Sequence, residues 1–202
     1  MFLTFKHTLS NFIVFTPNDI RKFFPKFDNK NLVNWQKKGY IERIRNNYYC
    51  FSDVEKNEDF LFFVANAIYT PSYVSLESAL SFYGIIPEGV YTVTSISTLK
   101  TNTFDTEFIR FTYRNVKPSL FFGYRLITYQ NQTIKMASLE KTILDYLYLN
   151  PQINNLNDFE ALRWNKIELL NLNQNLMNNY LELFDSKALN QRVVNFKSYL
   201  YA

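Results

Sequence analysis

The sequence predicts an α+β protein, in which an N-terminal winged helix-turn-helix is followed by a mixed α/β domain with a small sheet and C-terminal helices. Three observations predict this fold. Residues 28–51 place an amphipathic helix, a glycine stop and a basic hairpin in succession. Residues 91–136 are rich in Thr, Ile, Phe and Tyr, which favour strands. Residues 139–200 carry apolar side chains at helical spacing.

The composition is that of a globular protein. The chain has 202 residues, of which 47% are hydrophobic and 20% charged, and this length suits one or two domains. Its longest apolar run, Phe60–Ala65, is too short to span a membrane, and the start lacks the pattern of a signal peptide. A single cysteine, Cys50, excludes an internal disulfide. We expect a soluble, cytoplasmic protein without membrane contact.

Positive charge is concentrated at the N-terminus. Residues 1–50 carry a net charge of +6, whereas the whole chain carries +4, so the remainder is slightly acidic. A basic module on a near-neutral body is typical of a nucleic-acid-binding protein. The alternative is an ordinary solvated charged surface.

Two short helices are predicted before residue 25. The first covers Leu3–Phe12. Thr16 is a good N-cap for the second, which begins at Pro17, where a missing N–H costs nothing. This helix covers Pro17–Phe24, because Pro25 cannot continue it.

The third helix is capped by Asp28 or Asn29 and ended by Gly39. Leu32 and Trp35 fall on one side, which is expected to pack against the core. The opposite side is polar and basic, and it comprises Lys30, Asn34, Lys37 and the flanking Lys38.

A basic hairpin follows. Its strands cover Tyr40–Ile44 and Tyr48–Phe51, and strict alternation places Arg43 and Arg45 on one face. Asn46 and Asn47 form the turn, because Asn adopts positive φ more readily than most residues. The polar stretch after Asp53 predicts a domain boundary, with residues 1–53 binding DNA and residues 54–202 forming a second domain.

The second domain opens with helices at 59–69 and 76–83, the latter capped by Ser75 and ended by Gly84. A sheet is expected at about 91–136, with strands Tyr91–Ser97, Glu107–Tyr113, Tyr124–Tyr129 and Thr133–Met136. Asn131-Gln132 is the expected turn between the last two strands. Ser138 caps a helix over 139–149, and the helical tail at 156–200 contains helices at about 156–163, 167–184 and 187–199.

Double-stranded DNA is the partner that these residues favour. Lys and Arg contact phosphate or guanine, and Asn reads adenine through two hydrogen bonds. Arginines on a wing contact phosphates or the minor groove. The predicted DNA-binding residues are Lys30, Asn34, Lys37, Lys38, Arg43, Arg45, Asn46 and Asn47. A helical domain with a solvated cationic face is the alternative.

Catalysis is not expected, and neither is a cofactor or a structural metal ion. His7 is the only histidine, and Cys50 has no neighbouring base that would make a thiolate. No glycine-rich phosphate loop is present. Asp105 and Glu107 would share one face of a strand and bind Mg²⁺, so a metal-dependent nuclease is a weaker alternative.

Three segments resemble one known family. Residues 32–49, with the pattern Leu-x-x-Trp-x-x-x-Gly-Tyr-Ile-x-Arg-Ile-x-x-x-Tyr-Tyr, are similar to the N-terminal winged helix of AbiEi-type antitoxins. Residues 73–88 resemble that family's Y-(I/V)-S-x-x-S-A-L-x-x-x-G-L segment, and residues 134–147 its A-(T/S)-x-E-K-A-L-L-D segment. Order and spacing agree over about residues 15–150. The matching family-motif residues are Ser75, Ser78, Gly84, Glu140, Lys141 and Asp145.

The resemblance implies a bacterial antitoxin that represses transcription from its own operator, upstream of its operon. Its functional partner would be a nucleotidyltransferase-type toxin, countered without a stable complex. The family wing usually has an Arg-x-Gly turn, whereas Asn46-Asn47 follows Arg45 here.

Two interpretations of the remaining motif stay open. Glu140 favours the helix dipole and Lys141 pairs with Asp145 at i,i+4, so a network that holds the fold is favoured over a catalytic one. The rival to the DNA-binding hypothesis is a protein-partner-binding module whose winged helix no longer reads DNA.

Overall fold

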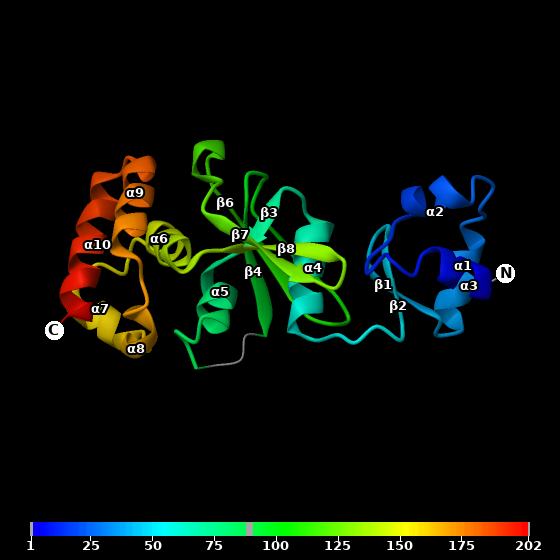
Figure 1. Ribbon diagram of the computed structural model, residues 1–202, viewed down its shortest axis with the longest axis horizontal. Coiled ribbons are helices and arrows are strands. Elements are labelled where there is room, and N and C mark those ends of the chain that lie inside the picture. The colour runs from blue at the N-terminus through cyan, green and yellow to red at the C-terminus, as the bar shows by residue number, and fades with distance from the viewer. Residues whose placement is uncertain (1, 88–90, 202) are drawn as a thin grey trace.

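The computed structural model describes residues 2–87 and 91–201. Over these residues the chain is an α+β protein with ten α-helices, a two-stranded hairpin near the N-terminus and a six-stranded mixed sheet. Figure 1 shows three parts in succession along the long axis: the N-terminal helices with their hairpin, the sheet, and the C-terminal helices. The two ends of the chain therefore lie at opposite ends of the molecule.

The N-terminal part contains helices α1 (Phe2–Thr8), α2 (Pro17–Phe23) and α3 (Lys30–Lys37), then strands β1 (Ile41–Arg45) and β2 (Tyr48–Phe51). The predicted cap of α2 is confirmed, because the Thr16 side chain accepts from the Asp19 N–H and the Asp19 side chain from the Thr16 N–H. Helix α1 ends earlier than predicted. The chain tightens into turns, in which Ser10 N–H donates to the carbonyl of His7.

An aromatic-rich core holds these elements together, and it comprises Phe5, Leu9, Phe15, Ile20, Leu32, Trp35, Ile41 and Phe51. Leu32 and Trp35 are buried, as the sequence predicts for the packing side of α3. Phe15 pairs with Tyr49 as an isolated antiparallel bridge, with N–H···O distances of 2.9 and 3.0 Å in the two directions. This bridge fixes the segment before α2 against the hairpin.

A bulge interrupts the hairpin. The pairing of β1 with β2 shifts between Arg43 and Arg45, so the strict alternation predicted for β1 is wrong beyond Arg43. Ile41 belongs to the N-terminal core, whereas Ile44 is buried in a second core together with Cys50 and residues of α4 and the sheet. The hairpin is therefore packed on both of its faces.

The sheet has the strand order β5-β6-β4-β3-β8-β7. Its strands are β3 (Ser72–Val74), β4 (Thr92–Ser97), β5 (Asn102–Asp105), β6 (Arg110–Asn115), β7 (Tyr124–Tyr129) and β8 (Gln132–Ala137). β4 and β6 run parallel, as do β3 and β8, and the other pairs are antiparallel. The turn before β8 lies at Gln130-Asn131, one residue earlier than predicted, with Gln130 at φ 52.

Two of these strands were not predicted. β3 has three residues, all buried, and so shows no alternation. β5 is a short, largely exposed edge strand built from Asn, Thr, Phe and Asp. Both lack the pattern of apolar and polar residues by which a strand is found in a sequence.

Helices pack on the sheet, and further helices follow it towards the C-terminus. They are α4 (Glu58–Ile68), α5 (Leu76–Phe82), the short 3₁₀ helix η1 (Pro118–Leu120), α6 (Leu139–Leu149), α7 (Leu156–Ala161), α8 (Lys166–Leu169), α9 (Gln174–Phe184) and α10 (Lys187–Leu200). α4 packs against β3 and β8, and α6 packs against α5, α9 and α10. Figure 1 shows α6 between the sheet and the C-terminal helices.

One predicted helix is two. The expected helix at 167–184 divides into α8 and α9, because the Asn173 side chain accepts from the Leu176 N–H and starts a new helix. Leu172, between the two, is buried in the core. Hydrophobic spacing alone did not distinguish this cap from a polar residue within a helix.

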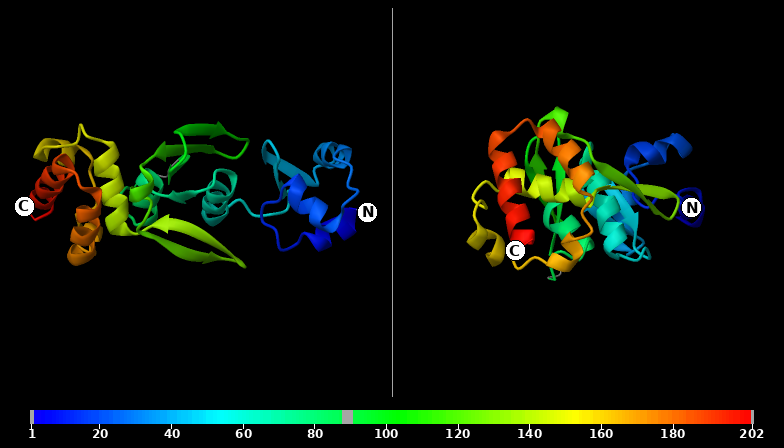
Figure 2. Two further views of the ribbon diagram at one scale, coloured as in Figure 1. Left: turned by 90° about the horizontal axis from the view of Figure 1, so that it is seen from above. Right: turned by 60° about the vertical axis from the view of Figure 1, so that its left-hand side comes forward.

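The β7–β8 hairpin extends from the sheet towards the N-terminal part (Figure 2). At its tip Gln132 Nε2 donates to the carbonyl of Asn11 over 3.5 Å. Among the described helices, none has both the length and the apolar character needed to cross a bilayer.

Candidate nucleic-acid interface

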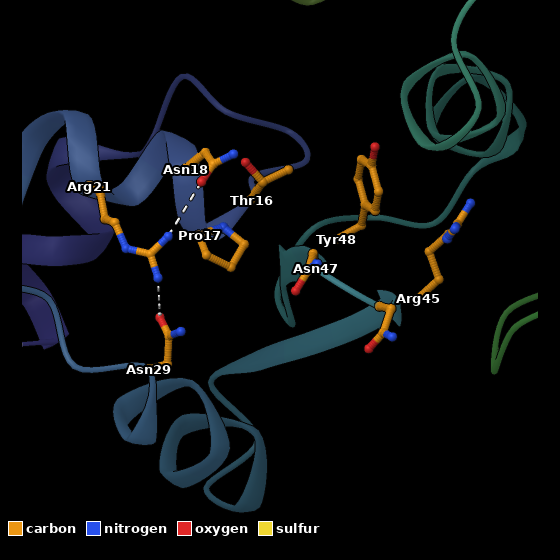
Figure 3. A pocket seen from close by; sticks show the side chains of 9 residues that line it. Thr16, Pro17, Asn18, Arg21, Asn29, Arg45, Asn47 and Tyr48 are labelled. Carbon is orange, nitrogen blue, oxygen red and sulfur yellow. Dashed lines mark hydrogen bonds between the residues drawn. The ribbon is translucent and has the colours of Figure 1, made fainter.

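A polar groove of about 670 Å³ lies between the start of α2, the start of α3 and the turn of the β1–β2 hairpin. Its lining residues are Thr16, Pro17, Asn18, Arg21, Asn29, Arg45, Asn46, Asn47 and Tyr48 (Figure 3). These described lining residues include two arginines and four asparagines, and no aspartate or glutamate. The groove therefore offers hydrogen-bond donors to an anion without a fixed negative charge in its walls.

The carboxylate of α2, which belongs to Asp19, is already hydrogen-bonded within the helix start. Asp19 accepts hydrogen bonds from Thr16 Oγ1 over 2.7 Å and from Lys22 Nζ over 2.8 Å. Burial raises the pKa of the Asp19 carboxyl, but the hydrogen bonds from Lys22 and Thr16 outweigh burial and lower this pKa overall. The Asp19 carboxylate thus stabilises the start of α2, and its oxygens are already hydrogen-bonded.

Arg21 joins the two helices that border the groove. One terminal nitrogen donates to Asn18 Oδ1 and the other to Asn29 Oδ1, each over 3.3 Å (Figure 3). Asn29 immediately precedes α3. Sequence reasoning did not include Arg21 or Asn18 in the site. Their spacing of three residues on α2 was the available signal, since it places both on one helical face.

The predicted side of α3 is exposed. The carboxylate of Asp28 accepts from the Lys30 N–H over 2.9 Å at the start of the helix, whereas Asn29, the other predicted cap, makes no side-chain capping bond. All four predicted side chains of this helix face solvent: Lys30, Asn34, Lys37 and Lys38. None of them takes part in the ion pairs found among the described residues.

The hairpin turn has the predicted backbone. Asn47 adopts φ 65, which confirms that an asparagine supplies the positive φ at this turn. Arg43 and Asn46 are exposed, and an Arg43 terminal nitrogen donates to Asn46 Oδ1. Arg43 therefore lies beside the turn and the groove.

Arg45 is placed differently from the expectation. Its Nη1 donates to the carbonyl of Ile68 over 2.9 Å, and its guanidinium carbon lies 3.9 Å from the centre of the Phe104 ring. Figure 3 shows this side chain directed away from Arg21. The structure thus turns Arg45 towards the sheet domain, because the bulge at Ile44 changes the face on which the next side chain lies.

On the other side of the hairpin, a groove of about 700 Å³ has Arg43 and Asn46 on one wall and Phe104, Asp105 and Glu107 on the other. Asp105 ends β5 and Glu107 lies beyond the strand, so the two do not share a strand face. Arg110 Nε donates to Asp105 Oδ1 over 2.6 Å. Within the described ranges, no three His, Cys, Asp or Glu side chains gather in a way that could hold a metal ion.

Two of the family-motif residues meet Asp145 in the buried interior between β3 and α6. The Asp145 carboxylate is fully buried and accepts from Lys141 Nζ, from Ser75 Oγ over 3.0 Å and from Tyr73 Oη over 2.9 Å. The predicted pairing of Lys141 with Asp145 is confirmed. The predicted cap by Ser75 is wrong, since its side chain makes no capping bond to α5 and binds Asp145 instead.

Aromatic rings surround the ammonium group of Lys141. Its Nζ lies 4.7 Å from the Phe184 ring centre and 4.8 Å from that of Phe122. Burial lowers the pKa of Lys141, while the charge of Asp145 opposes this shift. Tyr73, which completes the network, was missed as a site residue. Its position at the head of the second motif was the signal that pointed to it.

The other family-motif residues connect secondary-structure elements. Ser78 Oγ accepts from the Thr94 N–H over 2.8 Å and fixes α5 on β4. Glu140 Oε1 accepts from the Asn173 N–H over 2.9 Å and fixes α6 on the start of α9. Gly84 adopts φ 68 where α5 ends. These contacts connect α5 with β4 and α6 with the start of α9.

Cys50 lies buried in the hairpin. Burial raises the pKa of its thiol to about 12, so the thiol stays protonated at neutral pH and is a poor nucleophile. His7 lies on α1, outside both grooves.

Comparison of the sequence with protein-family models gives no match, and comparison with curated proteins gives none either.

Proposed function

We propose that the N-terminal part is a winged helix-turn-helix that binds double-stranded DNA, with α3 in the major groove and the β1–β2 hairpin as the wing. The groove beside α2 carries this proposal. It brings donors from three elements to one surface, and its described lining includes no carboxylate. Phosphate contacts of this kind set the position of a protein on a duplex.

The path of the DNA backbone follows from the groove. A backbone strand separates the major groove, which would hold α3, from the minor groove, which would hold the wing. That strand would cross between α3 and the hairpin turn, where Asn18, Arg21 and Asn47 line the groove. Arg21 is held by two hydrogen bonds and is therefore positioned in advance.

The exposed side of α3 supplies the remaining contacts. Lys30, Lys37 and Lys38 would neutralise phosphates, and Asn34 would reach a base edge. Arg43 and Asn46 would add contacts from the wing. Arg45 is left out, because its guanidinium is engaged with Ile68 and Phe104.

We further propose that the protein is an antitoxin that represses its own operon, as the three sequence segments imply. Its functional partner would be a nucleotidyltransferase-type toxin, countered without a stable complex. The network around Asp145 supports a structural role for the third segment, because Lys141 and Asp145 are fully buried. The protein would not be an enzyme.

The test is binding of the full chain to a fluorescent duplex from upstream of its own gene, followed by anisotropy. Affinity should fall steeply between about 50 and about 200 mM salt, because binding releases counterions. A Lys30→Ala/Lys37→Ala double variant should bind more weakly to all sequences and lower the salt slope by about two. Asn34→Ala should relax discrimination at one base pair.

The matched control is a Lys117→Ala/Lys187→Ala double variant, which removes the same charge from exposed positions in the sheet domain and α10. It should bind like the wild type. Equal losses in both double variants, or no binding by the wild type at low salt, would contradict the proposal. Capture of a stable protein complex together with failed DNA binding would favour a partner-binding module instead.

A further inference from the structure

We propose, on the basis of the DNA-binding function above, that Arg45 is a positioning residue through which the sheet domain holds the hairpin turn in its DNA-binding orientation. The guanidinium contacts one group on each of three elements: Tyr48 on the hairpin, Ile68 on α4 and Phe104 on β5. Residues 45 and 104 are far apart in the sequence, so this contact belongs to the tertiary structure.

The contact with α4 uses the end of a helix. Ile68 is the last residue of α4, and the final carbonyls of a helix have no partner within it. Arg45 Nη1 donates to this carbonyl over 2.9 Å. A cation at a helix C-terminus also meets the negative end of the helix dipole. Arg45 therefore caps α4 from another part of the chain.

The contact with β5 uses an aromatic face. The guanidinium carbon lies 3.9 Å from the centre of the Phe104 ring and 5.6 Å from that of Tyr48. A planar guanidinium stacks on such rings and is attracted to their faces. Arg45 is half-buried between them, which strengthens this attraction over that of an exposed pair.

The bulge in β1 directs Arg45 to this place. With strict alternation Arg45 would share the exposed face of Arg43. The shift between Arg43 and Arg45 instead places Ile44 in the core of the sheet domain and Arg45 at the edge of that core. The bulge thus directs both an apolar residue, Ile44, and a charged residue, Arg45, towards the sheet.

Coupling to DNA follows from chain connectivity. Asn46 and Asn47 come directly after Arg45 and line the polar groove. A change at the end of α4 or at Phe104 is therefore transmitted to the turn. By thermodynamic linkage, DNA bound at the turn would stabilise the contacts of Arg45 in the same measure.

The salt dependence of DNA binding distinguishes positioning from a direct phosphate contact. A residue that neutralises a phosphate adds about one to the salt slope, whereas a positioning residue changes affinity without changing the number of counterions released. A substitution of Phe104 removes one of the three partners of Arg45 and leaves the cation in place.

The experiment compares Arg45→Gln, Phe104→Leu and the double variant in the anisotropy assay, after circular dichroism has shown that all are folded. Each single variant should weaken binding about fivefold, the low end of coupling between sites. The double variant should lose no more than one of the singles, at the wild-type salt slope. Phe104→Tyr, which keeps the aromatic face, should bind like the wild type.

Arg163→Gln is the control, because it removes a cation from an exposed position among the C-terminal helices. It should leave both affinity and salt slope unchanged. A slope lowered by about one in Arg45→Gln, with normal binding by Phe104→Leu, would make Arg45 a phosphate contact. That result overturns the positioning role and leaves the DNA-binding function standing. Failure of the wild type to bind overturns the function itself.

Discussion

Ser75 Oγ donates to Asp145 Oδ2 over 3.0 Å, although 70 positions separate the two residues in the chain. With Tyr73 and Lys141 they form a buried polar network that connects β3 with α6. Removing two charges from water is costly, and the cost is offset only when each group is fully hydrogen-bonded. Asp145 accepts from three donors, whereas the Lys141 ammonium donates to Asp145 and otherwise lies against aromatic rings.

Replacing Lys141 alone should be severely destabilising. Lys141→Met leaves an uncompensated carboxylate in the core, and we expect the free energy of unfolding to fall by about 3–5 kcal/mol. Lys141→Met/Asp145→Asn should recover part of this loss, since an amide oxygen still accepts from Tyr73 and Ser75. Urea unfolding measures both. A double variant less stable than Lys141→Met would show that the pair does not act as a unit.

Gly123 should tolerate a side chain less well than Gly39. Both adopt positive φ, at 74 and 68 respectively. A Cβ at Gly123 would lie 3.0 Å from Cγ of Lys141 and 3.1 Å from Cε2 of Tyr180, whereas nothing lies within 4 Å at Gly39. Gly39→Ala should cost about 1–2 kcal/mol of unfolding free energy, and Gly123→Ala about 1–3 kcal/mol more from crowding. Equal thermal shifts would contradict this packing.

Cys50 should lower stability at alkaline pH. Burial raises the pKa of its thiol to about 12, while an unfolded cysteine has a pKa of about 8.5. Between these values the native state binds the extra proton, so the free energy of unfolding falls as pH rises. Burial also raises the pKa of Tyr73 and of Tyr113, but these contributions are common to wild type and variant.

The measurement compares urea unfolding of wild type and Cys50→Ala at about pH 8 and about pH 10. The wild type should lose about 2 kcal/mol more than the variant over this interval. The native thiol should also resist alkylation at about pH 8 and react once urea unfolds the chain. Parallel pH profiles would show that Cys50 is not buried as described.

The hairpin turn should accept glycine and reject a β-branched residue at position 47. Asn47 adopts φ 65, whereas the φ of Asn46 is not positive. Asn47→Gly should leave the thermal midpoint nearly unchanged, and Asn47→Val should cost about 1–2 kcal/mol. Asn46→Val is the matched control and should cost less. A larger loss of stability for Asn46→Val than for Asn47→Val would show that the positive φ belongs to Asn46.

Local chemistry allowed much of the fold to be predicted. Thr16 and Ser138 both cap helices as expected, because a cap needs only the side chain and the next three residues. Ser75 has the same Ser-Leu-Glu context as Ser138, but its side chain is used by Asp145. Local sequence did not distinguish the two, since the competing acceptor comes from a distant helix.

The candidate site divides in the same way. The exposed side of α3 followed from helical spacing alone, which places Lys30, Asn34 and Lys37 opposite Trp35. The orientation of Arg45 did not, since it depends on a bulge and on a ring from the sheet domain. Arg21 was not predicted as a site residue, because its position depends on a hydrogen bond to Asn29, which lies at the start of α3 and not on the helix of Arg21.

The two-sided hairpin restricts how this protein can change over time. Ile41 belongs to one core and Ile44 to the other, within a single five-residue strand. A fragment ending at residue 53 would expose Ile44 and Cys50 to water. The sheet without the hairpin would lose these two residues from its core. The two halves should therefore be inherited together, and substitutions at residues 44, 45 and 104 should covary among homologues instead of drifting separately.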